Sequence, residues 1–409
     1  MKIYFRFLVV IIIALAGCGS TSNASVFKPA PINVDTTTEP KVVIPPADTV
    51  KKQAAKKRTL KDMGALQISI LLPFNITAGE YKMPDVIADY YEGILLGLDS
   101  LKHMGLDVVV NVYDTKDDSA TVKRITWKEE LAKSDVIIGP TFKKGHAQLL
   151  QYVKPRNIAL ISPFSNANMW TDSNHCALYC TPDEKSEAAV LAKTIKEKYP
   201  KANILLFNDD TKEDKDFLWR FKLAAKELGL SGWKDITYKA EWDITPHLKT
   251  GDSAVNVIVA PTNNVRIAMQ LLTQLKNPEN NNILFVKDSW LNFDNINYQT
   301  YQLWQQNNLH VLTHFFVDDT DQGVINFKHK YKQKYGAMPG NFAFRGFDHI
   351  MSVGQAYYKG EALTLAESID SLEYKGLHNN FKFRFNGKAM ENQAVNVIRF
   401  VDYRFIKVK

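Results

Sequence analysis

The sequence predicts an α/β protein built from parallel sheets with helices on both faces. Short apolar runs such as residues 68–72 alternate with longer stretches whose apolar residues fall three or four apart. This alternation occurs in two successive blocks, and a βαβ order places consecutive strands parallel in one sheet. Residues 67–409 are numerous enough to bury two separate cores.

The first block begins at Ile68. Pro73 ends its first strand, and Gly105 stops the helix that follows. We expect strands at residues 68–72, 108–113, 136–138 and 158–161, and helices at 84–104, 121–133 and 142–152.

The second block begins at Thr181, which we expect to cap a helix with Pro182 in its first turn and Glu184 completing a capping box. Strands are expected next at 204–207, 255–260 and 283–286, with helices at 214–228 and 263–275. A third stretch returns with a strand at 311–316 and helices at 324–335 and 346–358.

The C-terminal end differs from both blocks. Phe381, Phe383 and Phe385 alternate with basic residues, and Asn386-Gly387 is a turn signal. Residues 394–400 and 403–408 are therefore expected to be antiparallel strands.

The N-terminus has the features of an export signal. Lys2 and Arg6 precede an apolar run over residues 7–16 that is too short to span a membrane. Residues 15–18, Leu-Ala-Gly-Cys, resemble a bacterial lipobox, which implies a lipoprotein signal peptide over residues 1–18 and a lipid on Cys18. An ordinary secretory signal with an incidental cysteine is the alternative. By resemblance to lipoprotein sorting, Gly19 after the cysteine favours the periplasmic face of the outer membrane.

Residues 19–66 are expected to be a disordered tether, because prolines are scattered among Thr, Ser, Ala and Lys with no apolar period. They hold eight Lys or Arg and four Asp or Glu, so much of the net charge of +7 lies there. Residues 67–409 are nearly neutral, which argues against a nucleic-acid partner. The basic tether is either a solvated linker or weakly attracted to anionic lipid or cell-wall polymer.

Catalytic signatures are missing from the sequence: it has no G-x-S-x-G, H-E-x-x-H or P-loop motif. We therefore expect neither an enzyme nor a cofactor. His175, Cys176 and Cys180 form the one Cys/His cluster. Idle thiols, a disulfide across a turn and a metal site all remain open for it, although a fourth metal ligand is not in sight.

The loops that follow the parallel strands offer the candidate ligand contacts, because ligands bind at the carboxyl ends of strands in open α/β sheets. Gly139-Pro140-Thr141 leads into a helix whose free N–H groups could hold an anion. The polar residues placed this way are Asn75, Thr141, Ser162, Ser165, Asn166 and Asp288, with Asn208, Asp209 and Asp210 in the second block. The same residue types also make turns and caps.

Several segments, in this order, resemble type I periplasmic-binding proteins of the Leu/Ile/Val-binding type. They are residues 68–74, 91–94, 135–140 and 161–163, the Phe327-x3-Tyr331-x3-Tyr335-Gly336-x2-Pro339 pattern, and residues 346–348. The Leu-Leu-Pro-Phe stretch at 71–74 and the lipobox also resemble the outer-membrane lipoproteins that activate penicillin-binding peptidoglycan synthases.

This resemblance implies two doubly wound lobes joined by three crossings, near residues 178–181, 290 and 368. Lobe 1 would hold 67–180 and 291–368, and lobe 2 would hold 181–290 and 369–409. Thr141 matches the hydroxyl that family members place on a ligand carboxylate, and Ser162 and Ser165 match the later hydroxyl loop. Residues 208–212 lack the aromatic residue that amino-acid binders carry there.

The expected function is therefore that of a non-catalytic, lipid-anchored envelope protein. Its lobes would close on a small polar solute, amino-acid-like or derived from the cell wall, for sensing or for delivery to a membrane transporter. The alternative is an interaction protein that regulates a cell-wall synthase and whose cleft is vestigial.

Overall fold

The computed structural model describes residues 64–408, apart from residues 76–82, 142, 166–172, 240–241, 252, 295, 360–361 and 371. The expected signal peptide, Cys18, residues 19–63 of the expected tether and Asn166 lie outside the described residues. Leu66, the last residue of the expected tether, is instead completely buried and begins the first strand, so the tether ends earlier than expected. Among those described, no helix combines the length and the apolar character needed to cross a membrane.

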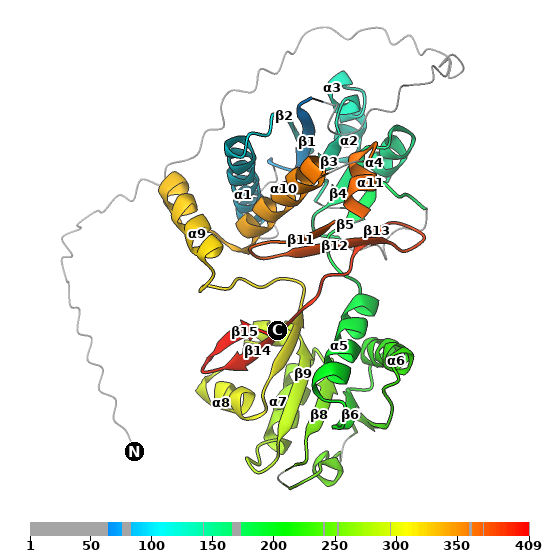
Figure 1. The fold of residues 1–409 in the computed structure, drawn as a ribbon, viewed down its shortest axis with the longest axis vertical. Helices are drawn as coiled ribbons and strands as arrows, with labels where there is room; N and C mark the ends of the chain where they lie inside the picture. The colour runs from blue at the N-terminus through cyan, green and yellow to red at the C-terminus, as the bar shows by residue number, and fades with distance from the viewer. Residues whose placement is uncertain are drawn as a thin grey trace, which may run out of the picture. The chain divides into compact units, whose positions relative to one another are not determined.

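The first sheet has eight strands in the order β11-β12-β13-β5-β4-β3-β1-β2 (Figure 1). β1 to β5 pair parallel with their neighbours, and the hairpin of β12 and β13 joins the sheet through a parallel pairing of β13 with β5. The strands are β1 (Leu66–Leu72), β2 (Val108–Asp114), β3 (Val136–Ile138), β4 (Ala159–Ser162), β5 (Ala177–Tyr179), β11 (Glu373–Lys375), β12 (Asn380–Phe385) and β13 (Met390–Asn392).

The second sheet has seven strands in the order β15-β14-β10-β9-β8-β6-β7. The strands β6, β7, β8, β9 and β10 pair parallel with their neighbours, and β14 and β15 add an antiparallel edge. The strands are β6 (Asn203–Asn208), β7 (Trp233–Thr237), β8 (Asn256–Ala260), β9 (Asn282–Lys287), β10 (His310–Thr313), β14 (Asn396–Val401) and β15 (Arg404–Lys407).

Helices cover both faces of the second sheet. Leu205 and Phe207 of β6 belong to a core with α7 and α8, whereas Ile204 and Leu206 belong to a separate core with α5 and α6. This alternation is the doubly wound α/β arrangement that the sequence predicts, so the fold class is confirmed. The helices are α5 (Glu184–Lys198), α6 (Lys212–Glu227), α7 (Val265–Gln274) and α8 (Tyr298–Gln306), with the 3₁₀ helices η4 (Thr245–His247) and η5 (Asp288–Asn292).

Around the first sheet, α1 and α10 pack closely side by side (Figure 1). The helices are α1 (Met83–His103), α2 (Ser119–Ile125), α3 (Glu129–Ala132), α4 (His146–Val153), α9 (Gln322–Tyr335), α10 (Asn341–Lys359) and α11 (Leu365–Asp370), with the 3₁₀ helix η2 (Lys154–Arg156). The single helix expected over 121–133 is divided into α2 and α3, because the chain leaves the helix at Thr126 and restarts at Glu129.

The chain passes between the two sheets three times: after β5, after β10 and after β13. The second and third passages come later than the expected positions near 290 and 368. β10 still belongs to the second sheet, where His310 pairs with Phe285 of β9. β11 to β13 still extend the first sheet. Lobe 1 therefore also includes β11 to β13, which end at Asn392. Lobe 2 includes β10 and ends with the β14–β15 hairpin.

The helix after the first passage also begins later than expected. Asp183, not Thr181, is the N-cap of α5, and its side chain accepts a hydrogen bond from the Ser186 backbone N–H at 2.8 Å. A carboxylate at this position satisfies a free N–H group and interacts favourably with the helix dipole. Thr181 and Pro182 are therefore part of the connecting segment.

Candidate functional site

The carboxyl ends of β1 and β2 hold the first predicted contact, Asn75. Its side chain is exposed and donates to Asp114 Oδ2 at 2.6 Å, while the Phe74 N–H donates to Asp114 Oδ1 at 3.0 Å. Asp114 thus ties the end of β1 to the end of β2. Asn75 already has a partner within the protein.

Thr141 follows β3, where the chain leaves the sheet at Gly139. Gly139 has a φ of 107°, and a Cβ there would lie 2.1 Å from the Leu71 carbonyl oxygen, so only glycine fits. Thr141 is 4% exposed, and its hydroxyl has no hydrogen-bond partner among the described residues. A buried hydroxyl without a partner costs free energy unless something fills the position.

Ser162 ends β4 and is completely buried. Its hydroxyl lies 3.4 Å from His146 Nε2, and the same nitrogen lies 3.2 Å from the Tyr179 hydroxyl. Burial lowers the pKa of His146 to about 4, so the imidazole is neutral at pH 7. Ser162 therefore belongs to a buried polar cluster with His146 and Tyr179. Ser165, three residues further on, is half-buried.

Arg345 of α10 lies among aromatic rings next to these loops. Its guanidinium carbon is 5.3 Å from the Phe342 ring centroid, 5.4 Å from Phe164 and 6.0 Å from Phe315. Its Nε is buried without a hydrogen-bond partner, and no carboxylate pairs with it in the part of the chain that the structure describes. Burial lowers the pKa of Arg345, although a guanidinium stays charged at pH 7.

Two glycines place Arg345 in this position. A Cβ at Gly93 would lie 1.9 Å from the Ala343 carbonyl oxygen, and one at Gly346 would lie 2.1 Å from that of Tyr90. These contacts let the backbones of α1 and α10 touch within two residues of the arginine. Both glycines belong to segments that carry the family resemblance, and close helix packing is their physical role here.

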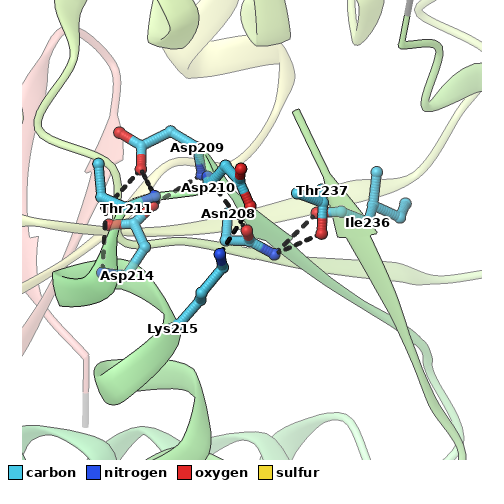
Figure 2. A network of polar contacts seen from close by, with 8 residues as sticks. All are labelled: Asn208, Asp209, Asp210, Thr211, Asp214, Lys215, Ile236 and Thr237. Atoms are coloured by element: carbon cyan, nitrogen blue, oxygen red, sulfur yellow. Dashed lines mark hydrogen bonds and ion pairs between the residues drawn. The ribbon is translucent and has the colours of Figure 1, made fainter. Parts of the chain in front are cut away.

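At the second sheet, the loop after β6 satisfies its own polar groups (Figure 2). Asp209 accepts from the Thr211 hydroxyl at 2.5 Å and from the Thr262 hydroxyl at 2.7 Å, and Asp210 pairs with Lys215 at 2.7 Å. Asn208 donates to the Ile236 carbonyl at 3.3 Å and to the Thr237 hydroxyl at 3.2 Å. These residues connect β6, β7 and α6, and their polar atoms are used within the protein.

The end of β9 places Lys287 and Asp288 beside the first turn of α5. Lys287 pairs with Glu184 at 2.5 Å, and burial raises the pKa of Glu187 to about 7. Burial also raises the pKa of Asp288. The carboxyl end of β9 therefore has three carboxyl groups, those of Glu184, Glu187 and Asp288, near the single Lys287. Burial opposes ionisation of Glu187 and Asp288.

His314, at the second passage between the sheets, lies close to both edges. Its Nδ1 is 3.7 Å from Asp288 Oδ2, but the pKa of His314 is lowered to about 4, by burial first and by the charge of Arg345 second. The imidazole is therefore neutral at pH 7, and the contact is not an ion pair. Of the predicted contacts, Asp288 lies next to the second connecting segment, and the Ser162 carbonyl accepts from the Cys180 N–H of the first at 3.4 Å.

Two buried side chains hold these connecting segments together. Asn392 donates to the Cys180 and Asn380 carbonyls, both at 3.0 Å, so it links the first passage to the third. Asp348 is completely buried and accepts from the N–H groups of Leu377, His378 and Asn379 at 2.7–2.9 Å. Asn379 in turn donates to the His314 carbonyl at 3.1 Å.

Cys176 and Cys180 are both free and buried. Burial raises the pKa of Cys176 to about 11 and that of Cys180 to about 12, so both thiols stay protonated. No group of three or more His, Cys, Asp or Glu side chains within the described ranges could hold a metal ion. Of the three alternatives for this cluster, the structure has idle thiols.

Sequence reasoning missed Arg345. The expected helix began at residue 346, which left the arginine outside any element. A signal was nevertheless present: Arg345 stands within Phe342-Ala343-Phe344-Arg345-Gly346-Phe347, a cation in an otherwise apolar segment. Such an arginine is either paired with an acid or available to an anion.

Known structures with this fold include binding proteins and one regulator. A protein from Rhodospirillum rubrum assigned to branched-chain amino acid ABC transport has a TM-score of 0.61 at 14% identity, over 84% of this chain and 100% of that one. The C-domain of LpoA from Haemophilus influenzae, a regulator of PBP1A, has a TM-score of 0.55 at 14% identity over the same shares.

A leucine complex of an ABC transporter substrate-binding protein from Desulfitobacterium hafniense has a TM-score of 0.51 at 16% identity, over 84% of this chain and 100% of that one. No curated protein matches the chain in sequence. The family model of the periplasmic binding proteins matches residues 83–404. The chain therefore belongs to the periplasmic binding protein family.

Proposed function

We propose that this protein binds a small anionic or zwitterionic solute between its two lobes and does not transform it chemically. The observation that carries the proposal is Arg345, a partly buried cation among three aromatic rings with no carboxylate partner in the described residues. Leaving a guanidinium uncompensated in such surroundings is costly, and a carboxylate or phosphate on a ligand would compensate it.

Two further features support this arrangement. On the same lobe as Arg345, the buried hydroxyl of Thr141 has no hydrogen-bond partner among the described residues, and Ser165 follows Phe164, whose ring lies against Arg345. Lobe 2 offers the carboxyl groups of Asp288 and Glu187, which suit an amino group on the ligand. Asn208, Asp209 and Asp210 are not included, because their polar atoms are already bonded within the loop.

A thermal screen tests the proposal. A ligand at about a hundred times its Kd adds roughly 2.7 kcal/mol to the free energy of unfolding, which shifts the melting temperature by several degrees. Arg345→Met keeps the packing of the side-chain stem against the aromatic rings but removes the charge, so the shift should disappear. Arg404→Met, at an exposed arginine of β15, should retain it.

The screen should contain amino acids, dicarboxylates, short peptides and cell-wall fragments. Equal shifts in the wild type and in Arg345→Met would show that Arg345 does not hold the ligand. Thr141→Ala should weaken the response by deleting one hydroxyl contact while leaving the fold intact.

The second candidate function is regulation of a cell-wall synthase through the protein surface. In this case the cleft is vestigial, and the protein neither senses nor transports a solute. Two observations favour it: Ser162 is buried against His146 instead of facing solvent, and the side chains of Asn208, Asp209 and Asp210 in the loop after β6 are bonded within the protein. Among the similar structures, the LpoA C-domain is a regulator of PBP1A. If no solute shifts the melting temperature while a pull-down from envelope extract recovers a synthase, this second function replaces the first.

We also propose that the protein is anchored in the cell envelope by a lipid on Cys18, at the periplasmic face of the outer membrane. The lipobox resemblance of residues 15–18 supports the lipid anchor, and the family to which the chain belongs supports the envelope location. Cys18→Ala should release the protein from membranes into the soluble fraction. Retention of the variant on membranes after a salt wash would mean that lipid is not the anchor.

A further inference from the structure

A hollow of about 760 Å³ lies on the flank of the second sheet, between α7 and the segment that follows β7. It is separate from the residues proposed above to hold a solute. Its lining residues are Tyr238, Trp242, Val265, Arg266, Met269, Gln270, Thr273 and Gln274.

One wall of the hollow is aromatic and held in place. The Trp242 ring packs on Phe207 at 4.8 Å between centroids and on Tyr238 at 5.7 Å. Gln274 fixes the backbone beside it, donating to the Trp242 carbonyl at 3.1 Å and accepting from the Ile244 N–H at 2.8 Å. The wall therefore offers a rigid aromatic surface without an ordering cost on binding.

The α7 side of the hollow carries polar side chains with unused bonding capacity beside Val265 and Met269. Arg266, Gln270 and Thr273 stand four and three residues apart, so they follow one face of α7. Arg266 and Gln270 are exposed, and neither has a hydrogen bond or ion pair with another described residue. The Thr273 hydroxyl donates to the Met269 carbonyl at 2.8 Å and can still accept.

We propose that this hollow binds an acidic saccharide. The C–H face of a pyranose ring packs against an aromatic ring face, which the Trp242 and Tyr238 rings supply. An amide such as that of Gln270 both donates to and accepts from sugar hydroxyls. The guanidinium of Arg266 can bind a carboxylate through two parallel N–H···O bonds, which selects an acidic sugar over a neutral one.

The geometry favours a saccharide over the other ligand class that aromatic surfaces often bind. Proline-rich peptides insert prolines into slots between aromatic side chains. The rings of Tyr238 and Trp242 touch at 5.7 Å with an interplanar angle of 57°, which leaves no slot between them. A purely apolar ligand would strip water from Arg266 and Gln270 without replacing its hydrogen bonds.

Titration of the full-length protein with defined saccharides tests the proposal, by tryptophan fluorescence and calorimetry. The acidic probes are a tetrasaccharide of alternating glucuronic acid and N-acetylglucosamine, and the N-acetylglucosamine–N-acetylmuramic acid disaccharide. The neutral probe is an N-acetylglucosamine tetramer. At least one acidic probe should bind with a Kd below about 1 mM, at least about tenfold more tightly than the neutral probe.

Arg266→Ala should reduce the affinity for the acidic probes to that for the neutral probe. Gln270→Ala should reduce the affinity for both the acidic and the neutral probes. Both side chains are exposed, so neither change should disturb folding. Trp219→Ala and Arg404→Ala, at an exposed tryptophan of α6 and an exposed arginine of β15, are the matched controls and should bind normally.

Three results would overturn the proposal. The first is no binding of either acidic probe at about 10 mM. The second is unchanged acidic-probe affinity in Arg266→Ala. The third is binding of a decaproline peptide that is weakened by Gln270→Ala while the saccharides do not bind, which would make the hollow a peptide site.

Discussion

Asp348→Ala is expected to lower the free energy of unfolding by about 3–5 kcal/mol, because three buried backbone donors lose their acceptor. The carboxylate accepts three backbone N–H groups from residues 377–379, all at 2.9 Å or less. Alanine leaves these donors buried without acceptors, and each such loss costs about 1–3 kcal/mol. The gain from no longer burying a charge offsets part of this cost, because burial raises the pKa of Asp348 to about 6.

Chemical and thermal denaturation of the purified protein measure this effect. The free energy of unfolding of Asp348→Asn should lie between those of the wild type and of Asp348→Ala. One side-chain oxygen still accepts, while the amide nitrogen faces a backbone donor. Asp216→Ala, at an exposed position of α6, should change stability little. A loss below about 1 kcal/mol in Asp348→Ala would mean that water or a shifted backbone replaces the carboxylate.

The contacts of Asp348 also bear on where the chain could bend if the two lobes close. Asp348 holds the segment before β12, and Asn379 in that segment donates to the carbonyl of His314 at the second passage between the sheets. Asn392 ties the first passage to the third. These bonds hold the connecting segments to lobe 1, so any closing movement of the lobes would take place on the lobe 2 side of them.

Much of the fold could be predicted from periodicity alone. The strand at 136–138 and the helix over 84–104 are set by local apolar patterns, which the sequence displays directly. The passages between the sheets could not be placed this way, because they depend on which strand pairs with which. The pattern of residues 310–313 is the same whether this strand joins the first sheet or the second, and only its pairing with β9 decides.

The candidate site was less predictable, for a related reason. The sequence predicts Ser162 and Thr141 as loop hydroxyls open to a ligand. The Ser162 hydroxyl instead meets His146, sixteen positions earlier in the chain, and the Thr141 hydroxyl meets no described partner. Arg345 matters because no carboxylate among the described residues pairs with it, and the absence of such a partner is a property of the folded arrangement. By contrast, the contact between Asp209 and Thr211 is local. That these side chains bond to each other and not to a ligand could therefore be predicted from turn chemistry.

Asp214→Asn is expected to change the pH dependence of stability by about 2–4 kcal/mol between pH 4 and pH 7.5. Asp214 is 4% exposed, and burial raises its pKa to about 7, against an unfolded value of about 3.9. Its neighbour Asp209 stays ionised: burial raises its pKa, but the hydrogen bonds from Thr211 and Thr262 lower it by more.

The sign follows from proton uptake. Between about pH 4 and pH 7 the folded protein keeps a proton on Asp214 that the unfolded chain has lost, so stability falls as the pH rises. Below this range the group costs nothing, and above it the folded protein carries the full cost of a buried carboxylate. Asparagine does not titrate and can still accept the Asp209 N–H bond of 3.0 Å, so the variant should gain stability over the wild type as the pH rises.

The comparison must be made between variants and not from the wild-type curve alone. Burial lowers the pKa of His146, His310 and His314 to about 4, and these groups add stability as the pH rises over the same range. Subtracting the wild-type unfolding free energy from that of Asp214→Asn at each pH cancels these histidines. Asp216→Asn, on the exposed face of the same helix, should give a flat difference. An equally flat difference for Asp214→Asn would mean that folding does not raise the pKa of Asp214.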